Sequence, residues 1–238
     1  MDRESVENKS RRVRDMFGKI AARYDFLNHF LSANVDRRWR KRCVREISRR
    51  NLVPNPRILD LGCGTADLSI AFSGMGTVVG CDFCYPMLRI GGEKIAGGTY
   101  PNKVFLMGAD ALALPFTDAS FDIVVSSFVL RNLADIDSGF REARRVLRPG
   151  GLLGILDFGM PRTPVVAPLY RIYFQKILPR IGKLVSGVEG PYGYLPDSVQ
   201  AFPPVEKLKE IAECTGYKDV DYKLLTGGIA ILLVGRAA

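Results

Sequence analysis

The chain has 238 residues, of which 47% are hydrophobic, and its formal net charge is +9. That length suits one large domain able to bury about 70–75% of its unfolded surface, and the hydrophobic fraction excludes a disordered chain. No apolar run is long enough to span a bilayer. Acids among the first fifteen residues argue against a secretory signal or an acid-poor transit peptide, so a cytoplasmic protein is expected.

The five cysteines are scattered and do not form a disulfide framework. Cys81 and Cys84 make a C-x-x-C pair, but no second pair or histidine cluster lies near it, and His29 is the only histidine. Cysteines packed as small hydrophobic residues are therefore favoured over a zinc or redox site. No metal is expected.

Two helices are predicted before residue 51. At 11–24 apolar residues recur at spacings of three and four, with charged residues on the other side, which indicates an amphipathic helix. The second helix, at about 36–50, carries the basic residues Arg37, Arg38, Arg40, Lys41, Arg42, Arg45, Arg49 and Arg50. Two interpretations of this basic face stay open, a solvated surface or a contact with phosphate on nucleic acid or anionic lipid.

From residue 57 onward, predicted strands and helices alternate. The strands fall near 57–61, 77–82, 103–108, 121–127 and 151–157, and the helices near 66–73, 86–95 and 136–147. Such alternation is typical of a doubly wound α/β fold, a parallel sheet with helices on both faces. A helix at 205–214 and strands near 218–224 and 229–235 follow.

The stretch 160–200 interrupts this alternation. It is rich in proline and contains the aromatic residues Tyr170, Tyr173, Phe174, Tyr192 and Tyr194. Long insertions of this kind usually cover a site, so we expect a lid. A loop with its own small core is the alternative.

Residues 58–65 read Ile-Leu-Asp-Leu-Gly-Cys-Gly-Thr, an apolar strand followed by a glycine-rich turn. Gly62 and Gly64 let the backbone turn sharply and approach a ligand closely. Asp82 ends the next predicted strand, where a carboxylate can accept hydrogen bonds from both hydroxyls of a ribose. Because the third glycine of the dinucleotide fingerprint is absent, the pattern favours a nucleoside cofactor without phosphates, and S-adenosylmethionine is the common one.

Further polar residues end the other predicted strands, where ligands of open α/β sheets bind. We expect Asp60 and the Gly62–Thr65 turn near the amino-acid half of the cofactor, and Asp110 near the adenine amino group. Ser126–Ser127 should lie beneath the reacting centre. Taken alone, Asp60 or Asp82 could instead cap a helix or form a turn.

From Phe17 to the end, several motifs resemble those of the ubiquinone/menaquinone biosynthesis C-methyltransferases. They are Tyr24–Asn28 with Ser32 and Trp39, Leu114–Phe116, Phe121–Asp122, Phe128–Asn132, Arg145–Gly151, Leu156–Phe158, Tyr194–Leu195, Ser198–Val199 and Leu225–Gly228. The resemblance implies a class I, Rossmann-like methyltransferase domain over 1–238, with a mostly parallel seven-stranded sheet. Its expected parts are an N-terminal helical cap at 1–50, a cofactor-binding core at 57–159, a substrate lid at 160–200 and a C-terminal helix and strand pair at 201–238.

The same resemblance places cofactor-binding residues at Thr65, Asp82, Asp110, Ala111 and Ser127. The chain also departs from the family pattern. Asp36 stands where histidine is usual, Ala66 replaces a common glycine, Asp157 replaces glutamate and Gly159 replaces serine. These departures concern the substrate more than the reaction.

The implied reaction moves the methyl group of S-adenosylmethionine to a ring carbon of a polyprenylated quinol. Demethylmenaquinol is the favoured substrate and a ubiquinone precursor the alternative. A ring carbon becomes nucleophilic when a neighbouring phenol loses its proton, so the site needs a base, a cation that favours phenolate, or both. The candidate catalytic residues are Arg131, Asn132, Asp157, Tyr24, Asn28 and His29.

Each candidate has an expected role. Arg131 supplies the cation, Asn132 orients the ring or a water, and Asp157 is the base, directly or through water. The three N-terminal residues belong to a segment expected to fold over the pocket, and His29 suits a base by its pKa. The alternatives are a structural His29 and an Arg131 that serves only as a surface ion-pair partner.

A polyprenyl tail would explain both the basic helix and the lid. The helix at 36–50 could rest on anionic headgroups at the inner face of the cell membrane while the 160–200 segment admits the tail. An RNA methyltransferase, a nicotinamide oxidoreductase and a non-catalytic cofactor-binding scaffold remain as other functions. The chain shows no RNA-binding appendage, so no nucleic acid partner is expected. The oligomeric state is open, a homodimer included.

Overall fold

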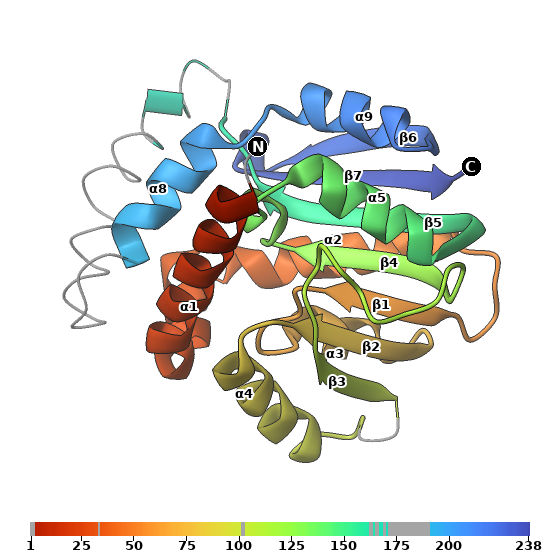
Figure 1. Cartoon of the computed structure of the whole chain (residues 1–238), viewed down its shortest axis with the longest axis horizontal. Coiled ribbons are helices and arrows are strands. Elements are labelled where there is room, and N and C mark those ends of the chain that lie inside the picture. The colour runs from red at the N-terminus through yellow and green to blue at the C-terminus, as the bar shows by residue number, and fades with distance from the viewer. Residues whose placement is uncertain are drawn as a thin grey trace.

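A seven-stranded sheet forms the centre of the computed structural model, which describes residues 3–32, 34–100, 103–161, 164, 167–168, 170 and 191–238. Its strands are β1 (Arg57–Leu61), β2 (Thr77–Asp82), β3 (Val104–Gly108), β4 (Phe121–Ser127), β5 (Leu147–Phe158), β6 (Tyr217–Leu225) and β7 (Ala230–Ala237). Their order is β3-β2-β1-β4-β5-β7-β6, with β1 to β5 parallel and β7 antiparallel to both of its neighbours (Figure 1). The predicted mostly parallel α/β fold is confirmed.

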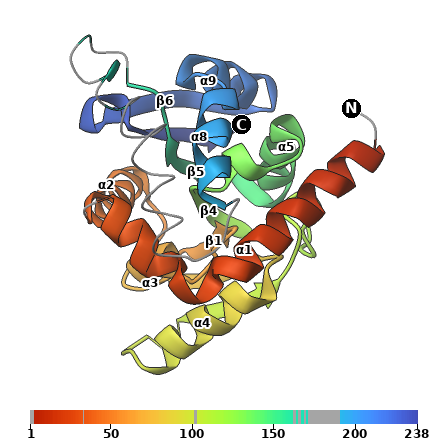
Figure 2. The same cartoon turned by 90° about the vertical axis from the view of Figure 1, so that its left-hand side faces the viewer.

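Helices cover both faces of this sheet (Figures 1 and 2). The helices are α1 (Arg3–Leu31), α2 (Val35–Arg50), α3 (Asp67–Phe72), α4 (Tyr85–Ala96), α5 (Ile136–Val146), α8 (Pro191–Ala201) and α9 (Val205–Cys214), with short 3-10 turns η1 (Leu130–Asn132) and η3 (Thr226–Gly228). Ile47 of α2 and Phe72 of α3 join one core cluster, and Phe140 of α5 and Leu208 of α9 join another. Burial on both faces explains why the central strands are almost continuously apolar.

Two predicted elements are longer in the structure. The predicted helix 11–24 extends over 3–31, a stretch without proline and with Gly18 as its single glycine. The predicted strand 151–157 begins at Leu147, because the β4–β5 ladder pairs Phe121 with Leu147 and then shifts register. The shift accommodates Pro149–Gly151, where Gly150 has φ 76°.

The predicted lid at 160–200 is described only in part. Residues 171–190, with Tyr173 and Phe174, lie outside the described residues. Its end forms α8, a helix that the sequence patterns did not reveal. Tyr170 and Val199 are buried together against Phe158.

Four of the five cysteines follow the packing interpretation, and Cys214 is exposed. Cys43, Cys63, Cys81 and Cys84 are buried free thiols. Burial raises the pKa of Cys81 to about 12, so this thiol is a poor nucleophile and a poor metal ligand at neutral pH.

Helices α1 and α8 lie across the same end of the sheet, as Figure 2 shows face on. At this end the chain leaves β1, β2, β3 and β4 for the segments that carry the predicted site. The N-terminal helix therefore folds over the site, as expected from the sequence.

Candidate functional site

The glycine turn after β1 depends on backbone conformations that favour glycine. Gly62 has φ 69° and Gly64 has φ 52°. A Cβ atom at Gly62 would lie 2.5 Å from the Val129 side chain, while one at Gly64 would meet nothing within 4 Å. Gly62 is thus required by packing, whereas Gly64 faces open space that a ligand can approach. Ala66, which replaces a glycine common in the family, has φ 67° just before α3. The backbone at this position is therefore left-handed, a conformation that favours glycine.

Asp82, at the end of β2, combines the two roles considered for it. Its carboxylate accepts hydrogen bonds from the backbone N–H groups of Gly64 at 2.9 Å and Cys84 at 2.7 Å. Burial raises the pKa of Asp82, and these N–H donors oppose the rise by stabilising the charged form. The carboxylate fixes the turn and keeps lone pairs that can accept from ribose hydroxyls.

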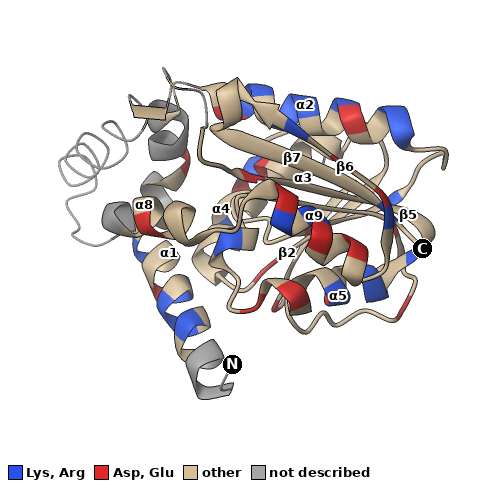
Figure 3. Cartoon of the chain, turned by 90° about the horizontal axis from the view of Figure 1, so that it is seen from above, with Lys and Arg blue, Asp and Glu red and all other residues tan. Residues whose placement is uncertain are grey.

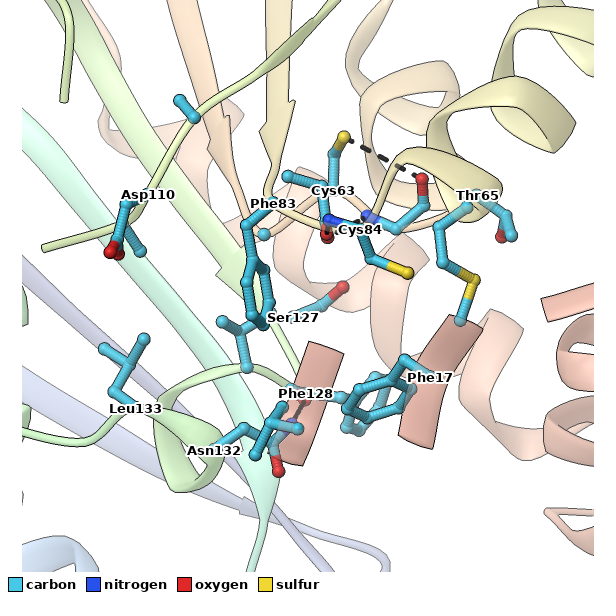
Figure 4. Close-up of a pocket in the computed structure, with 18 of the residues that line it drawn as sticks. Phe17, Cys63, Thr65, Phe83, Cys84, Asp110, Ser127, Phe128, Asn132 and Leu133 are labelled. Carbon is cyan, nitrogen blue, oxygen red and sulfur yellow. Dashed lines mark hydrogen bonds between the residues drawn. The ribbon is translucent and has the colours of Figure 1, made fainter. Parts of the chain in front are cut away.

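A cavity of about 940 Å³, counted out to its mouth, lies between this turn, the ends of β2 and β4, the segment after β3, η1 and α1 (Figure 4). Predicted residues that line it are Tyr24, Gly62, Gly64, Thr65, Asp82, Asp110, Ala111, Ser127 and Asn132. The topology therefore brings most of the predicted cofactor residues to one hollow.

Asp60, which was predicted near the cofactor's amino-acid half, is an exception. Its side chain is fully buried and does not line the cavity. Ser69 of α3 donates a hydrogen bond to it at 2.5 Å, and burial raises the pKa of Asp60 to about 7. Ser126 is buried as well and donates to the Leu61 carbonyl at 2.7 Å, so it joins β4 to the end of β1.

Arg131 and Asp157 form a buried ion pair rather than a separate cation and base. Their Nη1 and Oδ1 atoms are 2.7 Å apart, with side-chain exposures of 5% and 0%. The Arg131 guanidinium also lies 5.0 Å from the centre of the Phe158 ring. Because Asp157 is sealed from solvent and does not line the cavity, the geometry contradicts its prediction as a direct base. Its carboxylate accepts a hydrogen bond from the Arg131 guanidinium.

Asn132 follows Arg131 in the chain and lines the cavity. Its side chain donates to the Phe128 carbonyl at 3.1 Å and accepts from the Tyr194 hydroxyl at 3.2 Å. Tyr194 belongs to α8, so the end of the predicted lid contacts the Leu-Arg-Asn element. The sequence patterns named Tyr194 as an aromatic residue of the expected lid and as part of a family motif, but assigned it no individual role.

The predicted N-terminal candidates differ in what the structure says of them. Tyr24 lines the cavity and packs edge-on against Phe17, with ring centroids 5.7 Å apart. The backbone of Asn28 and His29 belongs to α1, but their side chains lie outside the described residues.

Phe83 is a site residue that the sequence patterns missed. Its ring points into the hollow between Asp110 and Ser127 (Figure 4). An aromatic face beside the ribose-binding acid can stack on a nucleobase. The sequence feature that could have identified Phe83 is its position directly after Asp82, at the end of a strand.

A charged cluster fastens the N-terminal helices to the glycine turn. Thr65 donates to Asp25 of α1 at 2.5 Å, and Lys94 of α4 contacts Asp25 at 2.5 Å and Asp67 at 2.8 Å. The prediction that Arg40 belongs to a basic surface is wrong. Arg40 is buried and pairs with Asp36 at 2.5 Å, which gives the unusual acid at position 36 a partner.

The residues present fit S-adenosylmethionine. Two carboxylates and an aromatic ring surround the adenosine end of the hollow, and no group of lysines or arginines suited to a pyrophosphate lines it in the described part of the chain. Gly64 leaves room for close backbone approach. Neutral ribose and adenine match this environment better than a dinucleotide does.

Comparisons with known proteins show the family of this chain. The sequence model of the ubiE/COQ5 methyltransferase family matches residues 5–236. The chain is 45% identical to the demethylmenaquinone methyltransferase of Thermus thermophilus, over 92% of this chain and 99% of that protein. It is 40% identical to the ubiquinone/menaquinone biosynthesis C-methyltransferase UbiE of Geobacter sulfurreducens, over 97% of this chain and 90% of that protein.

A solved structure shares the fold at low sequence identity. It is a SAM-dependent methyltransferase from Thermotoga maritima, described as a possible histamine N-methyltransferase, with a TM-score of 0.63 and 17% identity. The match covers 94% of this chain and 99% of that one. This likeness supports the fold alone.

Proposed function

The chain belongs to the ubiE/COQ5 methyltransferase family, and we propose that it methylates a ring carbon of a demethylated polyprenyl quinol, demethylmenaquinol before a ubiquinone precursor. S-adenosylmethionine is the methyl donor. The observation that carries the proposal is that Asn132, next to the Arg131–Asp157 pair, lines the same cavity as Asp82 and Ser127. Asn132, the chain neighbour of the candidate cation Arg131, thus shares one cavity with the candidate cofactor-binding residues.

The cofactor residues divide by the part of the molecule that they bind. Asp82 accepts from the ribose hydroxyls, Phe83 stacks on adenine, and Asp110 accepts from the adenine amino group. The turn from Gly62 and the end of β4 at Ser127 border the methionine part. When bound, the cofactor supplies an electrophilic methyl group on its sulfonium, and the protein's part is to align that methyl with the ring carbon and exclude water.

Arg131 is placed to favour a phenolate. Tyr194 provides a phenol beside it within the protein itself. Burial raises the pKa of Tyr194. The charges of Arg131 and Arg12 act against that rise and so favour the phenolate form, while the charge of Asp157 adds to the rise. A quinol hydroxyl at the same place would receive the same stabilisation, and its ring carbon would gain nucleophilic character.

The test is methyl transfer by purified protein from radiolabelled S-adenosylmethionine to short-chain demethylmenaquinol, to the matching ubiquinone precursor and to bulk RNA. We expect label in the demethylmenaquinol product and little in the other two. Asp82→Ala serves as a control that should fail through lost cofactor. Label in RNA alone, or no transfer to either quinol, would reject the proposal.

We further propose that α2 rests on anionic lipid at the membrane where the quinol resides. Its exposed basic residues are Arg37, Arg38, Lys41, Arg45 and Arg49. Figure 3 shows blue segments, the colour of lysine and arginine, along α2. No helix among the described residues is long and apolar enough to cross a membrane. Basic residues near an anionic surface each contribute about 1 kcal/mol to binding.

Sedimentation with vesicles of anionic or neutral lipid tests this contact. Replacing Arg37, Lys41 and Arg45 with serine should weaken binding to anionic vesicles about 100-fold, and salt should weaken the native protein likewise. The matched control replaces three exposed cations elsewhere, Arg89, Lys207 and Lys218. Equal losses in both variants, or indifference to lipid charge, would defeat the proposal.

A further inference from the structure

Arg40 reaches the cofactor cavity from α2, the second of the two N-terminal helices. Its side chain is 9% exposed and lines the hollow together with Thr65, Asp67 and Phe128. The guanidinium lies 5.5 Å from the centre of the Phe128 ring. Of the described residues that line the cavity, Arg40 is the one cation.

One edge of this guanidinium lacks a strong acceptor. Nη1 is 2.5 Å from Asp36, but Nε is buried without a hydrogen-bond partner, and Nη2 is 3.5 Å from Asp67. Asp67 is closer to Lys94, at 2.8 Å. A buried donor without an acceptor is costly, and Nε and Nη2 together form the fork that a carboxylate fits with two parallel hydrogen bonds.

We propose that Arg40 binds the α-carboxylate of the methionine moiety of S-adenosylmethionine. That carboxylate is the cofactor's only anionic group. Asp82, Phe83 and Asp110 mark the adenosine end of the hollow, whereas Arg40 lies with Thr65 and Asp67 beyond the glycine turn. The inference rests on the cofactor named in the proposed function and is independent of the quinol.

This contact also links the N-terminal helices to cofactor binding. Arg40 belongs to α2, while Asp25 of α1 accepts from Thr65 in the turn at 2.5 Å. A bound cofactor therefore contacts a group of the helices that cover it, in addition to the sheet loops.

The test compares two ligands that differ only in the carboxylate, S-adenosylhomocysteine and its decarboxylated analogue, by isothermal titration calorimetry. In Arg40→Met the Kd of S-adenosylhomocysteine should rise about 10- to 100-fold, the usual loss for a charge-assisted hydrogen-bonded pair. The Kd of the decarboxylated analogue should stay within about threefold, since it never used Arg40. Arg40→Lys should restore much of the discrimination.

Two further variants separate binding from folding. If Arg40→Met fails to fold, Asp36→Asn/Arg40→Met replaces it in the test. The double variant removes both members of the buried pair and leaves the net charge unchanged. Arg89→Met, an exposed change on α4, should alter neither affinity. Equal losses for both ligands, or no loss for either, would overturn the inference and leave the proposed function intact. Native protein that binds neither ligand would reject both.

Discussion

Replacing Asp157 with asparagine tests whether this carboxylate positions Arg131 or acts as a base. The change keeps the side-chain shape but removes a charge that is fully buried. Asp157 Oδ1 accepts from Arg131 Nη1 at 2.7 Å and from the Phe158 N–H at 2.8 Å, and Oδ2 accepts from the Arg131 N–H at 3.3 Å. An asparagine can serve only one of these two oxygen positions, and its NH₂ group would face a donor at the other.

The expected loss of stability follows from the buried guanidinium left behind. Removing one partner of a buried ion pair costs about 3–5 kcal/mol, so the free energy of unfolding measured in urea should fall by that amount. Asp157→Leu/Arg131→Met removes both charges and should be about 2–3 kcal/mol less destabilised than the sum of its two single variants. Additive losses would show that the pair is not coupled.

The kinetic readout separates the two roles. A misplaced Arg131 should lower kcat about 100-fold, while the Kd of S-adenosylhomocysteine stays within about threefold and the pH–rate profile keeps its shape. Loss of the acidic limb of that profile in Asp157→Asn would refute the positioning role and restore Asp157 as the base.

Three further outcomes are expected. The pKa of Asp60 is about 7 in the folded protein and about 4 in the unfolded chain, so the native protein loses stability as the pH rises through this window. In urea unfolding, the stability of Asp60→Asn relative to the native protein should therefore increase by about 2–3 kcal/mol between pH 5 and pH 8. A stability difference that does not change with pH would contradict the buried carboxylate. Tyr194→Phe frees the Asn132 amide and should change kcat or KM for the quinol about 5- to 10-fold without changing cofactor affinity in calorimetry. Asp82→Ala should weaken the binding of S-adenosylhomocysteine about 10- to 100-fold, because it removes the ribose acceptor and leaves two N–H groups of the turn without their acceptor. An unchanged affinity would show that the ribose does not bind at Asp82.

The two strand-end acids show where sequence patterns succeed and fail. Asp60 lies within the β1 ladder, opposite Gly80 of β2, and its side chain meets Ser69 of α3 on one face of the sheet. Asp82 is the last residue of β2, where the chain turns toward the cavity. A one-residue difference along a strand reverses the face of a side chain, so the pattern predicted an acid at the strand end but not the direction in which it points.

The Arg131 prediction shows a different limit. Arg131 was expected near the reacting region because it comes just after β4, a strand that Phe121 and the apolar run Ile123–Val125 predict. Its pairing with Asp157 depends on the β4–β5 ladder, which sets Ser127 beside Leu156. No spacing rule joins residues 26 positions apart, so the pair was interpreted as two independent groups.

Contiguous residues determined the strand–turn–strand unit, the left-handed glycines and the acid for a ribose, because each depends on backbone preferences and burial within a short stretch of chain. The tertiary structure alone decided which distant side chains meet. Asp25 reaches Thr65 across 40 positions, Tyr194 reaches Asn132 across 62, and Arg40 turns from a basic-looking helix into the cofactor cavity. These contacts depend on how whole helices pack on the sheet, and helix packing leaves no periodic signal in the residues that it brings together.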